Sequence, residues 1–348
     1  MSSARPSVFH PDERVLVTGG SGFIGTNLVD ECLRQEICVR NIDPLPPRND
    51  AQHALWEKLD PLNGAAVSSA VAAFDPTLVF HLGARTDLHG KSLADYALNI
   101  EGVYAIIDAC NAAPSVRRVI FASSRLVCRI GYQPAGENDY CPTTPYGESK
   151  MVGEQIVRRA KHRYEWTIVR PTSIWGPWFA VPYRDFFDAV SRGRYFHISG
   201  NVVKKSFGYV GNTVHELEQL AYAPADKLQG RTLYLGDYPP TDVREMADLI
   251  QRCTAAPRIR TIPRWPLAVV AHIGDLLQRV GWSEPPLTTF RLDNLTTEMV
   301  YDLAPLHDAV GPLPFSVAEG VQETVGWIRK QGIRNSQLTQ RRSVPSRS

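Results

Sequence analysis

Short apolar runs alternate with longer stretches of helical periodicity through the first half of the chain. Val15–Val17 is a short apolar run typical of a buried strand, and the apolar residues of 23–35 recur at helical spacing. The same pattern predicts further strands at 37–42, 56–59, 77–82, 116–122 and 166–170, and helices at 65–74, 94–112 and 146–163. Such alternation predicts an α/β fold with a doubly wound parallel sheet and right-handed crossovers.

The second half is less regular. Helices are predicted at 184–190, at 213–221, at 242–253 with Thr241 as its cap, and from a Ser316–Glu319 capping box towards Trp327; strands are predicted at 206–210 and 232–235. We therefore expect a sheet domain at 13–175, to which 206–236 returns. A smaller, mostly C-terminal α/β domain would comprise 176–205 and 237–331, with flexible termini at 1–12 and 335–348.

Composition narrows the class of protein. Apolar residues make up 43% and charged residues 21% of the 348 residues, and the formal net charge is +2, which gives no reason to expect a nucleic-acid partner. Six scattered cysteines without a C-x-x-C pair, and no cluster with metal-ligand spacing, favour a reduced, cytoplasmic, metal-free protein. The most apolar helix candidate, 265–280, contains Pro266, His272, Asp275 and Arg279, so we expect no membrane partner.

Three glycines follow the first predicted strand. Gly19 would permit a tight turn, Gly22 would let a pyrophosphate approach the backbone, and Gly25 would let the next helix pack closely on the strand. The helix N-terminus then offers N–H groups to the anion. A glycine-rich surface turn is the alternative when the triplet is viewed alone.

Asp43 ends the second predicted strand, eighteen residues after Gly25. An acidic side chain at this place can accept hydrogen bonds from an adenosine ribose and would repel a 2′-phosphate, which favours NAD over NADP. Arg48 weakens that preference. Alone, Asp43 reads equally well as a turn residue before Pro44.

The strongest catalytic candidates are Tyr146 and Lys150, four residues apart at the start of a predicted helix. The ammonium group would lower the pKa of the phenol, so that Tyr146 could exchange a proton with a substrate hydroxyl while hydride moves. Ser124, at the end of a predicted strand, would orient the substrate oxygen. A surface Tyr and Lys on an amphipathic helix is the alternative for this pair alone.

Several short motifs now occur in a recognisable order. They are TGGSGFIG at 18–25, HLGARTD at 81–87, FASS at 121–124, PYGESK at 145–150 and RPTSIWGP at 170–177. Together they resemble the extended short-chain dehydrogenase/reductase family, in its NAD-dependent nucleotide-sugar epimerase and dehydratase branch, over Arg14 to Trp327. The resemblance implies a Rossmann domain that holds NAD, a smaller domain that closes over a nucleotide-sugar substrate, and a homodimer.

The resemblance also implies roles for individual positions. Ser124, Tyr146 and Lys150 would be the catalytic triad. The cofactor would be bound by Gly19, Gly22, Phe23, Ile24, Asp43, Asp60, Leu82, Gly83, Ala84, Asn99, Ser123, Tyr146, Lys150 and Pro171. The substrate would be bound by Thr86, Arg125, Ser173 and Arg291, and no metal is expected.

Departures from the family pattern narrow the chemistry. Dehydratases of the family carry an Asp-Glu pair after the catalytic hydroxyl residue, whereas this chain has Arg125 and Leu126, so dehydration is disfavoured. Ser173 stands where many relatives have Asn. We expect an NAD-dependent epimerase of a nucleotide-diphosphate sugar. The alternatives are a net dehydrogenase or ketoreductase acting on a keto-sugar nucleotide or a 3-hydroxysteroid-like alcohol, and a non-catalytic NAD-binding protein.

Overall fold

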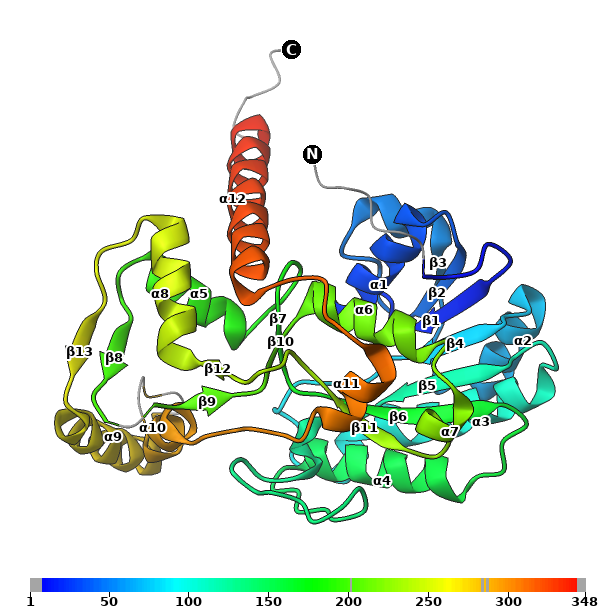
Figure 1. Ribbon diagram of the computed structural model, residues 1–348, viewed down its shortest axis with the longest axis horizontal. Coiled ribbons are helices and arrows are strands. Elements are labelled where there is room, and N and C mark those ends of the chain that lie inside the picture. Colours follow the sequence, from blue (N-terminus) through cyan, green and yellow to red (C-terminus); the bar gives the residue numbers. More distant parts are fainter. Residues whose placement is uncertain (1–7, 201, 283–284, 286–287, 343–348) are drawn as a thin grey trace. The chain divides into compact units, whose positions relative to one another are not determined.

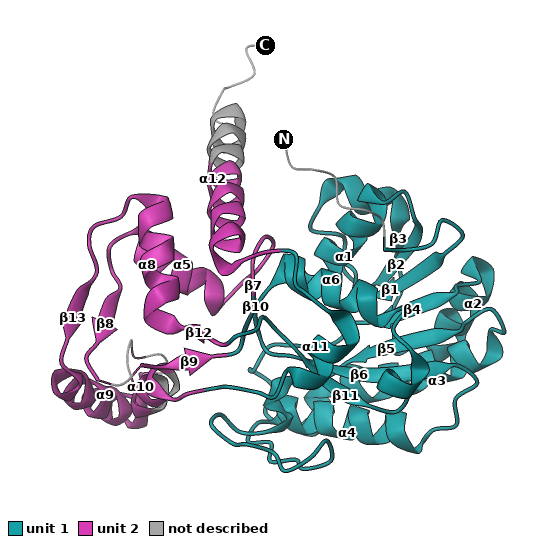
Figure 2. Ribbon diagram, viewed as in Figure 1, with its two compact units in different colours: residues 1–174, 206–239, 299–314 teal, residues 175–205, 240–298, 315–348 magenta. Residues whose placement is uncertain are grey.

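A computed structural model describes the chain except for residues 1–7, 201, 283–284, 286–287 and 343–348, together with the side chains of 290, 291, 294 and 333–342. The chain divides into two compact units, which are coloured separately in Figure 2. Unit 1 comprises residues 1–174, 206–239 and 299–314, and unit 2 comprises residues 175–205, 240–298 and 315–348.

A parallel sheet forms the centre of unit 1 (Figure 1). Seven strands of the described chain take the order β11-β6-β5-β4-β1-β2-β3, with every neighbouring pair parallel. They are β1 (Arg14–Thr18), β2 (Cys38–Asp43), β3 (Trp56–Lys58), β4 (Leu78–His81), β5 (Arg118–Ala122), β6 (Glu165–Pro171) and β11 (Thr232–Leu235). The order reverses beside β1, as in the Rossmann fold, so the predicted fold class is confirmed.

Helices cover both faces of this sheet. They are α1 (Phe23–Arg34), α2 (Gly64–Phe74), α3 (Leu98–Ala112), α4 (Pro145–Arg159), α6 (Val210–Leu220), α7 (Ala225–Leu228) and α11 (Ala304–Val310), with short 3-10 turns η1 (Asp50–Leu55), η2 (Leu93–Tyr96) and η3 (Arg125–Val127). Val15 and Val17 of β1 pack with α1, α6 and α11 in one core cluster, while Leu16 packs with α2, α3 and α4 in another. Successive strand residues point to opposite faces of the sheet, so the apolar run of β1 contributes side chains to both core clusters.

Unit 2 is built from small sheets and helices. Its strands are β8 (Phe196–Ile198), parallel to β13 (Arg260–Ile262), and β9 (Lys204–Lys205), antiparallel to β12 (Thr241–Asp242). Its helices are α5 (Tyr183–Ser191), α8 (Val243–Thr254), α9 (Arg264–Arg279), α10 (Thr289–Thr296) and α12 (Val317–Arg342). Helix α8 packs against α5 and α12, and α9 packs against α10. Two further strands, β7 (Ser173–Trp175) and β10 (Phe207–Tyr209), lie near the unit boundaries.

The structure differs from the sequence-based boundaries in several places. Residues 299–314 belong to unit 1, because Leu303, Leu306 and Val310 pack into its core. Phe9, expected in a flexible terminus, is buried against the same core. Helix α12 continues to Arg342, so the part of the tail at 335–342 that was expected to be flexible is helical, while 343–348 lie outside the described residues.

Two helix ends also differ from prediction. Helix α4 ends at Arg159 rather than Arg163, since Ala160 adopts an extended backbone. Helix α8 is capped by Asp242 rather than Thr241, because the Asp242 carboxylate accepts from the Arg244 N–H at 2.9 Å. The Ser316–Glu319 capping box is confirmed: Glu319 accepts from the Ser316 N–H at 2.8 Å, and Ser316 Oγ accepts from the Glu319 N–H at 3.3 Å.

Candidate dinucleotide site and catalytic residues

The glycine turn between β1 and α1 is a tight backbone cradle. Gly19 has φ +72°, and a Cβ there would lie 2.6 Å from the Cα of Gly83. A Cβ at Gly25 would collide with the carbonyl oxygen of Gly19. Gly22 is the N-cap of α1, which has neither a side-chain cap nor an acidic residue in its first turn, where Phe23 and Ile24 lie. The cradle therefore leaves the positive end of the helix dipole available for an anion such as a pyrophosphate.

Asp43 closes β2 beside this turn. Its carboxylate is mostly buried and accepts from the Ser21 N–H at 3.2 Å and the Leu45 N–H at 2.9 Å. Burial raises the pKa of Asp43, while these two hydrogen bonds and nearby Arg48 lower it. Arg48 is held by the carbonyl oxygen of Ser21 at 3.1 Å, so a carboxylate and a guanidinium lie together where a ribose would bind.

The loop that follows β4 is fixed by buried polar contacts. Thr18 Oγ1 accepts from the Gly83 N–H at 3.1 Å and lies 2.8 Å from His81 Nδ1. Burial lowers the pKa of His81 to about 3, so this histidine is neutral at ordinary pH. Leu82, Gly83 and Ala84 therefore lie on a fixed backbone next to the glycine turn.

Asn99, at the start of α3, is buried and hydrogen-bonds to residues of two other segments. Its side-chain oxygen accepts from the Arg85 N–H at 2.8 Å, and its amide group donates to the Arg85 carbonyl at 3.0 Å and to Ser149 Oγ at 2.9 Å. Ser149 Oγ donates in turn to the Tyr146 carbonyl at 2.7 Å. Asn99 thus ties the loop after β4 to the first turn of α4.

Helix α4 positions the two main catalytic candidates. Thr144 caps it by accepting from the Gly147 N–H at 3.1 Å, and Pro145 begins it. Tyr146 and Lys150 are both buried. The Ser124 hydroxyl lies close enough to that of Tyr146 to lower its pKa, and Lys150 Nζ donates to the Ala122 carbonyl at 2.9 Å. The fold therefore brings the three predicted residues together at the carboxyl end of β5.

The electrostatics of Tyr146 differ from the sequence-based expectation. Burial raises the pKa of Tyr146, while the nearby Ser124 hydroxyl and the charge of Arg125 lower it. Lys150 was expected to supply the positive charge, but its ammonium group is directed at the Ala122 carbonyl. Burial lowers the pKa of Lys150 to about 8, with Glu154 opposing the change. Arg125 is thus the cation that acts on Tyr146 in this structure.

The remaining predicted residues vary in placement. Ser123 is buried, and its hydroxyl lacks a hydrogen-bond partner within the described residues. Asp60 is exposed beside an open hollow of about 500 Å³ between β3 and α2. Thr86 is exposed in the loop after β4, and Pro171 ends β6.

Besides Thr86, two more of the four substrate candidates lie in unit 1. Arg125 donates to Met299 Sδ at 3.4 Å, and Ser173 is buried at the start of β7 with its N–H 3.4 Å from the Ser206 carbonyl. The side chain of Arg291 lies outside the described residues. Unit 1 therefore contains each predicted site residue whose side chain the structure describes.

Sequence reasoning missed Tyr96 as a neighbour of the catalytic candidates. Its ring is fully buried, 5.9 Å from the ring of Tyr146, and its hydroxyl donates to the Asp87 carbonyl at 2.7 Å. The only local signal was an aromatic residue near the start of a predicted helix, which is equally typical of a core position. Tyr96 helps to exclude water from Tyr146.

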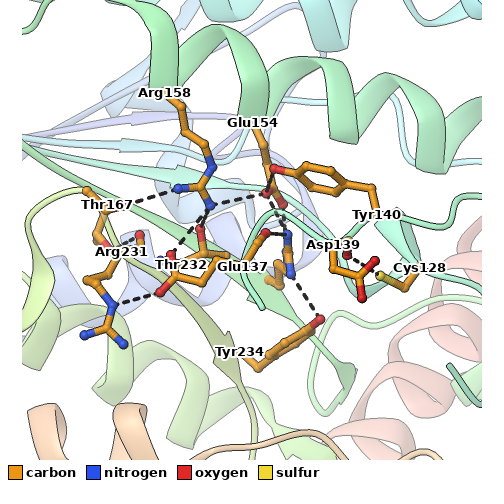
Figure 3. Close-up of polar contacts among 12 residues, drawn as sticks. Cys128, Glu137, Asp139, Tyr140, Glu154, Arg158, Thr167, Arg231, Thr232 and Tyr234 are labelled. Carbon is orange, nitrogen blue, oxygen red and sulfur yellow. Dashed lines mark hydrogen bonds and ion pairs between the residues drawn. The ribbon is translucent and has the colours of Figure 1, made fainter. Parts of the chain in front are cut away.

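A second omission is the buried ion pair between Glu154 and Arg170. Arg170 donates to both carboxylate oxygens of Glu154 at 2.8 Å. Figure 3 shows Arg158, Glu137 and Tyr140 gathered around Glu154, with Tyr234 on the other side of the network. The network links α4 to β6 and β11 one turn beyond Lys150. Glu154 and Lys150 share a helix face, and that spacing was the available signal.

The residues present fit a dinucleotide. Four features lie in unit 1 at the carboxyl ends of parallel strands. They are the glycine cradle, the start of α1 without a side-chain cap, the Asp43 carboxylate and the Ser123 hydroxyl, which has no hydrogen-bond partner within the described residues. Ligands of open α/β sheets bind at this edge. In the part of the chain that the structure describes, no group of three acidic, histidine or cysteine residues could hold a metal ion.

Comparisons with known proteins agree with this site. The model of the NAD dependent epimerase/dehydratase family matches residues 15–193. A 3-beta-hydroxysteroid dehydrogenase of Mycolicibacterium neoaurum is 27% identical over 326 residues, or 88% of each chain. An N-acetyl-alpha-D-glucosaminyl-diphospho-ditrans,octacis-undecaprenol 4-epimerase of Escherichia coli O157:H7 is 23% identical, over 90% of this chain and 95% of the relative.

Solved structures show the same fold. The crystal structure of UDP-glucose 4-epimerase with UDP-glucose from Thermotoga maritima has a TM-score of 0.70 and 20% identity, covering 91% of this chain and 99% of that one. The Thermus thermophilus UDP-glucose 4-epimerase in complex with NAD has a TM-score of 0.66 and 20% identity, with the same coverage. The chain therefore belongs to the NAD dependent epimerase/dehydratase family, as an enzyme of the extended short-chain dehydrogenase/reductase type whose cofactor is NAD.

Proposed function

We propose that the protein is an NAD-dependent epimerase of a nucleotide-diphosphate sugar, with Ser124, Tyr146 and Lys150 as its catalytic residues. The observation that carries the proposal is the placement of Tyr146 and Lys150, both buried on one face of α4, next to the Ser124 hydroxyl. A hydroxyl, a phenol and an ammonium group at the carboxyl end of a Rossmann strand can move a proton to and from a secondary alcohol.

Each side chain has a distinct part in this mechanism. Bound NAD supplies the acceptor for hydride. Tyr146 takes the proton of the sugar hydroxyl and returns it after the keto sugar has turned over in the site. Ser124 holds the substrate oxygen through its hydroxyl. The charge of Arg125 favours the phenolate form of Tyr146, against the burial that raises its pKa.

Two features favour epimerisation over elimination. Arg125 and Leu126 follow Ser124, so the acid pair that an adjacent-carbon elimination needs is missing at those positions. The Escherichia coli relative is named as an epimerase of a diphosphate-linked sugar. An enzyme that returns hydride to the opposite face of the same carbon needs only the groups that Ser124, Tyr146 and Lys150 supply.

A net dehydrogenase of an apolar secondary alcohol is the second candidate. Steroid dehydrogenases of Mycolicibacterium neoaurum and Mycobacterium tuberculosis are 27% and 28% identical over 88% and 89% of this chain. Unit 2 also exposes a run of large apolar side chains in α9, which a sugar substrate does not require. The same Tyr146 chemistry would then end with reduced cofactor released.

The test is a turnover assay with nucleotide sugars and with 3-hydroxysteroids, followed by absorbance at 340 nm and by chromatography of the sugar. Epimerisation predicts sugar interconversion without net NADH. Steady NADH production from an alcohol would establish the second candidate instead. We expect Tyr146→Phe to lower kcat by about a thousandfold, because it removes the acid–base group. Tyr104→Phe, at a half-exposed tyrosine of α3, is the matched control and should retain activity.

A thermal-shift measurement separates loss of chemistry from loss of binding. NAD should stabilise both the wild-type protein and Tyr146→Phe, since the glycine cradle is unchanged. Full activity of Tyr146→Phe would refute the catalytic assignment. Stabilisation by NAD without turnover of any alcohol or sugar would point to the non-catalytic alternative.

A further inference from the structure

Helix α9 (Arg264–Arg279) carries apolar side chains on two opposite faces. On the inner face, Leu267 and Ala271 are buried in a small core with Leu292 of α10. On the outer side, apolar side chains recur every three or four residues and so form one stripe that continues one residue beyond the helix. This α9 stripe consists of Trp265, Val269, Ile273, Leu276 and Val280, which are 72%, 55%, 52%, 60% and 74% exposed. An amphipathic helix needs one apolar face for its core, so the second requires another explanation.

Exposed apolar side chains are concentrated at this place. Of the fifteen large hydrophobic residues that are strongly exposed in the described part of the chain, seven lie between residues 265 and 282. Scattered exposed apolar residues are normal, but a contiguous patch marks an interaction site. Figure 1 shows α9 with α10 at the edge of unit 2, beyond β8 and β13.

The charge around the stripe is basic. Arg264 and Arg279 stand at the two ends of α9 and His272 between them, while exposed Arg258 and Arg260 precede the helix. Asp275, the sole acidic residue in the α9 sequence, is engaged with α10: its carboxylate accepts from the Thr289 N–H at 3.1 Å and the Thr289 hydroxyl at 2.6 Å. Arg264 forms an exposed ion pair with Asp293 of α10 at 3.3 Å, and Arg279 lies near Asp275, whereas Arg258 and Arg260 have no ion pair within the described residues. Basic side chains therefore still outnumber acidic ones beside the stripe.

Tryptophan residues lie at both ends of the stripe. Trp265 begins it and Trp282 follows it, and both indole rings are more than half exposed. Tryptophan favours the boundary between water and hydrocarbon, because the ring is apolar while its N–H seeks a polar partner. Among the described helices, none is long and apolar enough to cross a bilayer. A helix with this residue pattern is suited to lie in the plane of the boundary.

We propose that unit 2 binds the surface of an anionic phospholipid bilayer through α9. The α9 stripe would enter the boundary between headgroups and acyl chains, and the arginines would pair with lipid phosphates. A second copy of the chain is less suited to cover this face. A twofold contact through the stripe would bring the basic border of one copy towards that of the other. The expectation of no membrane partner rested on the lack of a spanning segment, which a surface helix does not need.

The experiment is co-sedimentation of the full chain with vesicles of phosphatidylcholine alone and with about one third phosphatidylglycerol. We expect binding to the anionic vesicles that weakens with salt, as screened charges require. Val269→Ser combined with Ile273→Ser should weaken binding by about tenfold or more, since it removes two apolar groups from the stripe. Arg264→Glu combined with Arg279→Glu should abolish the preference for anionic lipid.

A matched control removes exposed apolar side chains elsewhere. Leu33→Ser combined with Tyr104→Ser changes two exposed residues of unit 1 and should bind vesicles like the wild type. Circular dichroism and thermal unfolding check that each variant is folded. Vesicles with brominated acyl chains should quench the fluorescence of Trp265, so Trp265→Phe should lose part of the quenching.

Three outcomes would overturn the proposal. They are failure of the wild type to sediment with either kind of vesicle, unchanged binding by the serine variant, and unchanged quenching in Trp265→Phe. Light scattering of the protein alone tests whether a second copy covers the stripe. If the wild type is a dimer that does not bind vesicles, and the serine variant is a monomer, the stripe is a self-association surface.

Discussion

A carboxylate and a guanidinium lie close together at the end of β2, where the charge of one side chain can determine the preference between NAD and NADP. Asp43 is largely buried and fixed by two backbone N–H groups, and Arg48 lies beside it, fixed by the Ser21 carbonyl. The carboxylate suits a ribose diol, whereas the guanidinium suits a phosphate. Because the two groups lie side by side, removal of the carboxylate should leave the guanidinium to favour a phosphate.

We therefore expect Asp43→Asn to improve NADP binding relative to NAD by about tenfold. The amide keeps the shape of the side chain but removes the charge that repels a 2′-phosphate, and Arg48 remains to attract it. Calorimetric titration of both cofactors measures the ratio. Arg48→Ala in the Asp43→Asn background should abolish the gain. An unchanged ratio in Asp43→Asn would show that Asp43 does not face the 2′ position.

At the scale of elements, one buried ion pair ties α4 to β6. Arg170 and Glu154 have side chains only 1% and 2% exposed, and they are joined by two hydrogen bonds. Arg170 also donates to the Glu137 carbonyl at 2.7 Å and to the Tyr234 hydroxyl at 3.2 Å. The pair holds α4, and so Tyr146 and Lys150, at a fixed position on the sheet. Its stability depends on both charges being present.

Removal of either partner alone should be strongly destabilising. We expect Arg170→Met or Glu154→Leu to lower the free energy of unfolding by about 3–5 kcal/mol, because each leaves an unpaired buried charge. The double variant should recover most of that loss, since it buries no charge. Urea unfolding, monitored by tryptophan fluorescence, gives the free energy of unfolding of the wild type, the two single variants and the double variant. Additive effects in the double variant would mean that the two residues act independently.

At the scale of the whole molecule, unit 1 is assembled from three separate stretches of chain. Helix α6 and strand β11 come from residues 206–239, and α11 comes from residues 299–314, yet all three contribute to the core that contains β1. The middle stretch also contains two buried acids, Glu216 in α6 and Asp237 after β11. Burial raises the pKa of Glu216 well above its usual value and raises that of Asp237 to about 7.

These acids should make the stability of the protein depend on pH. A carboxyl group whose pKa is raised by folding stabilises the folded state fully below its unfolded pKa, near 4, and loses that contribution as pH rises through its folded pKa. We therefore expect the free energy of unfolding to fall between about pH 4 and pH 7. Glu216→Gln should flatten this dependence and raise stability at pH 8 by about 1–3 kcal/mol, because at that pH the folded protein must either bury the Glu216 charge or keep a proton on it.

Denaturant unfolding at pH 5 and pH 8 measures the effect of Glu216→Gln. Glu101→Gln, at an exposed residue of α3, is the matched control and should leave the pH dependence unchanged. Equal stability changes at both pH values in Glu216→Gln would show that Glu216 does not change its protonation between folded and unfolded states.

Much of the fold and part of the site could be predicted because the signals are local. The alternating periodicities predicted a parallel, doubly wound sheet. Within the turn itself, Gly19 has a positive φ and a Cβ at Gly25 would collide with the carbonyl oxygen of Gly19. The spacing of Tyr146 and Lys150 fixed their common helix face. These features depend on interactions between positions close in sequence, which a pattern can record.

The sequence by itself determined the alternating strands and helices, the glycine turn and the positions of Ser124, Tyr146 and Lys150. Only the tertiary structure showed that Tyr96 packs beside Tyr146, that Arg125 supplies the positive charge near it, and that the exposed side of α9 is as apolar as its buried side. The physical reason is burial. Whether a polar or apolar side chain meets water, a charge or another ring depends on segments far away in the chain.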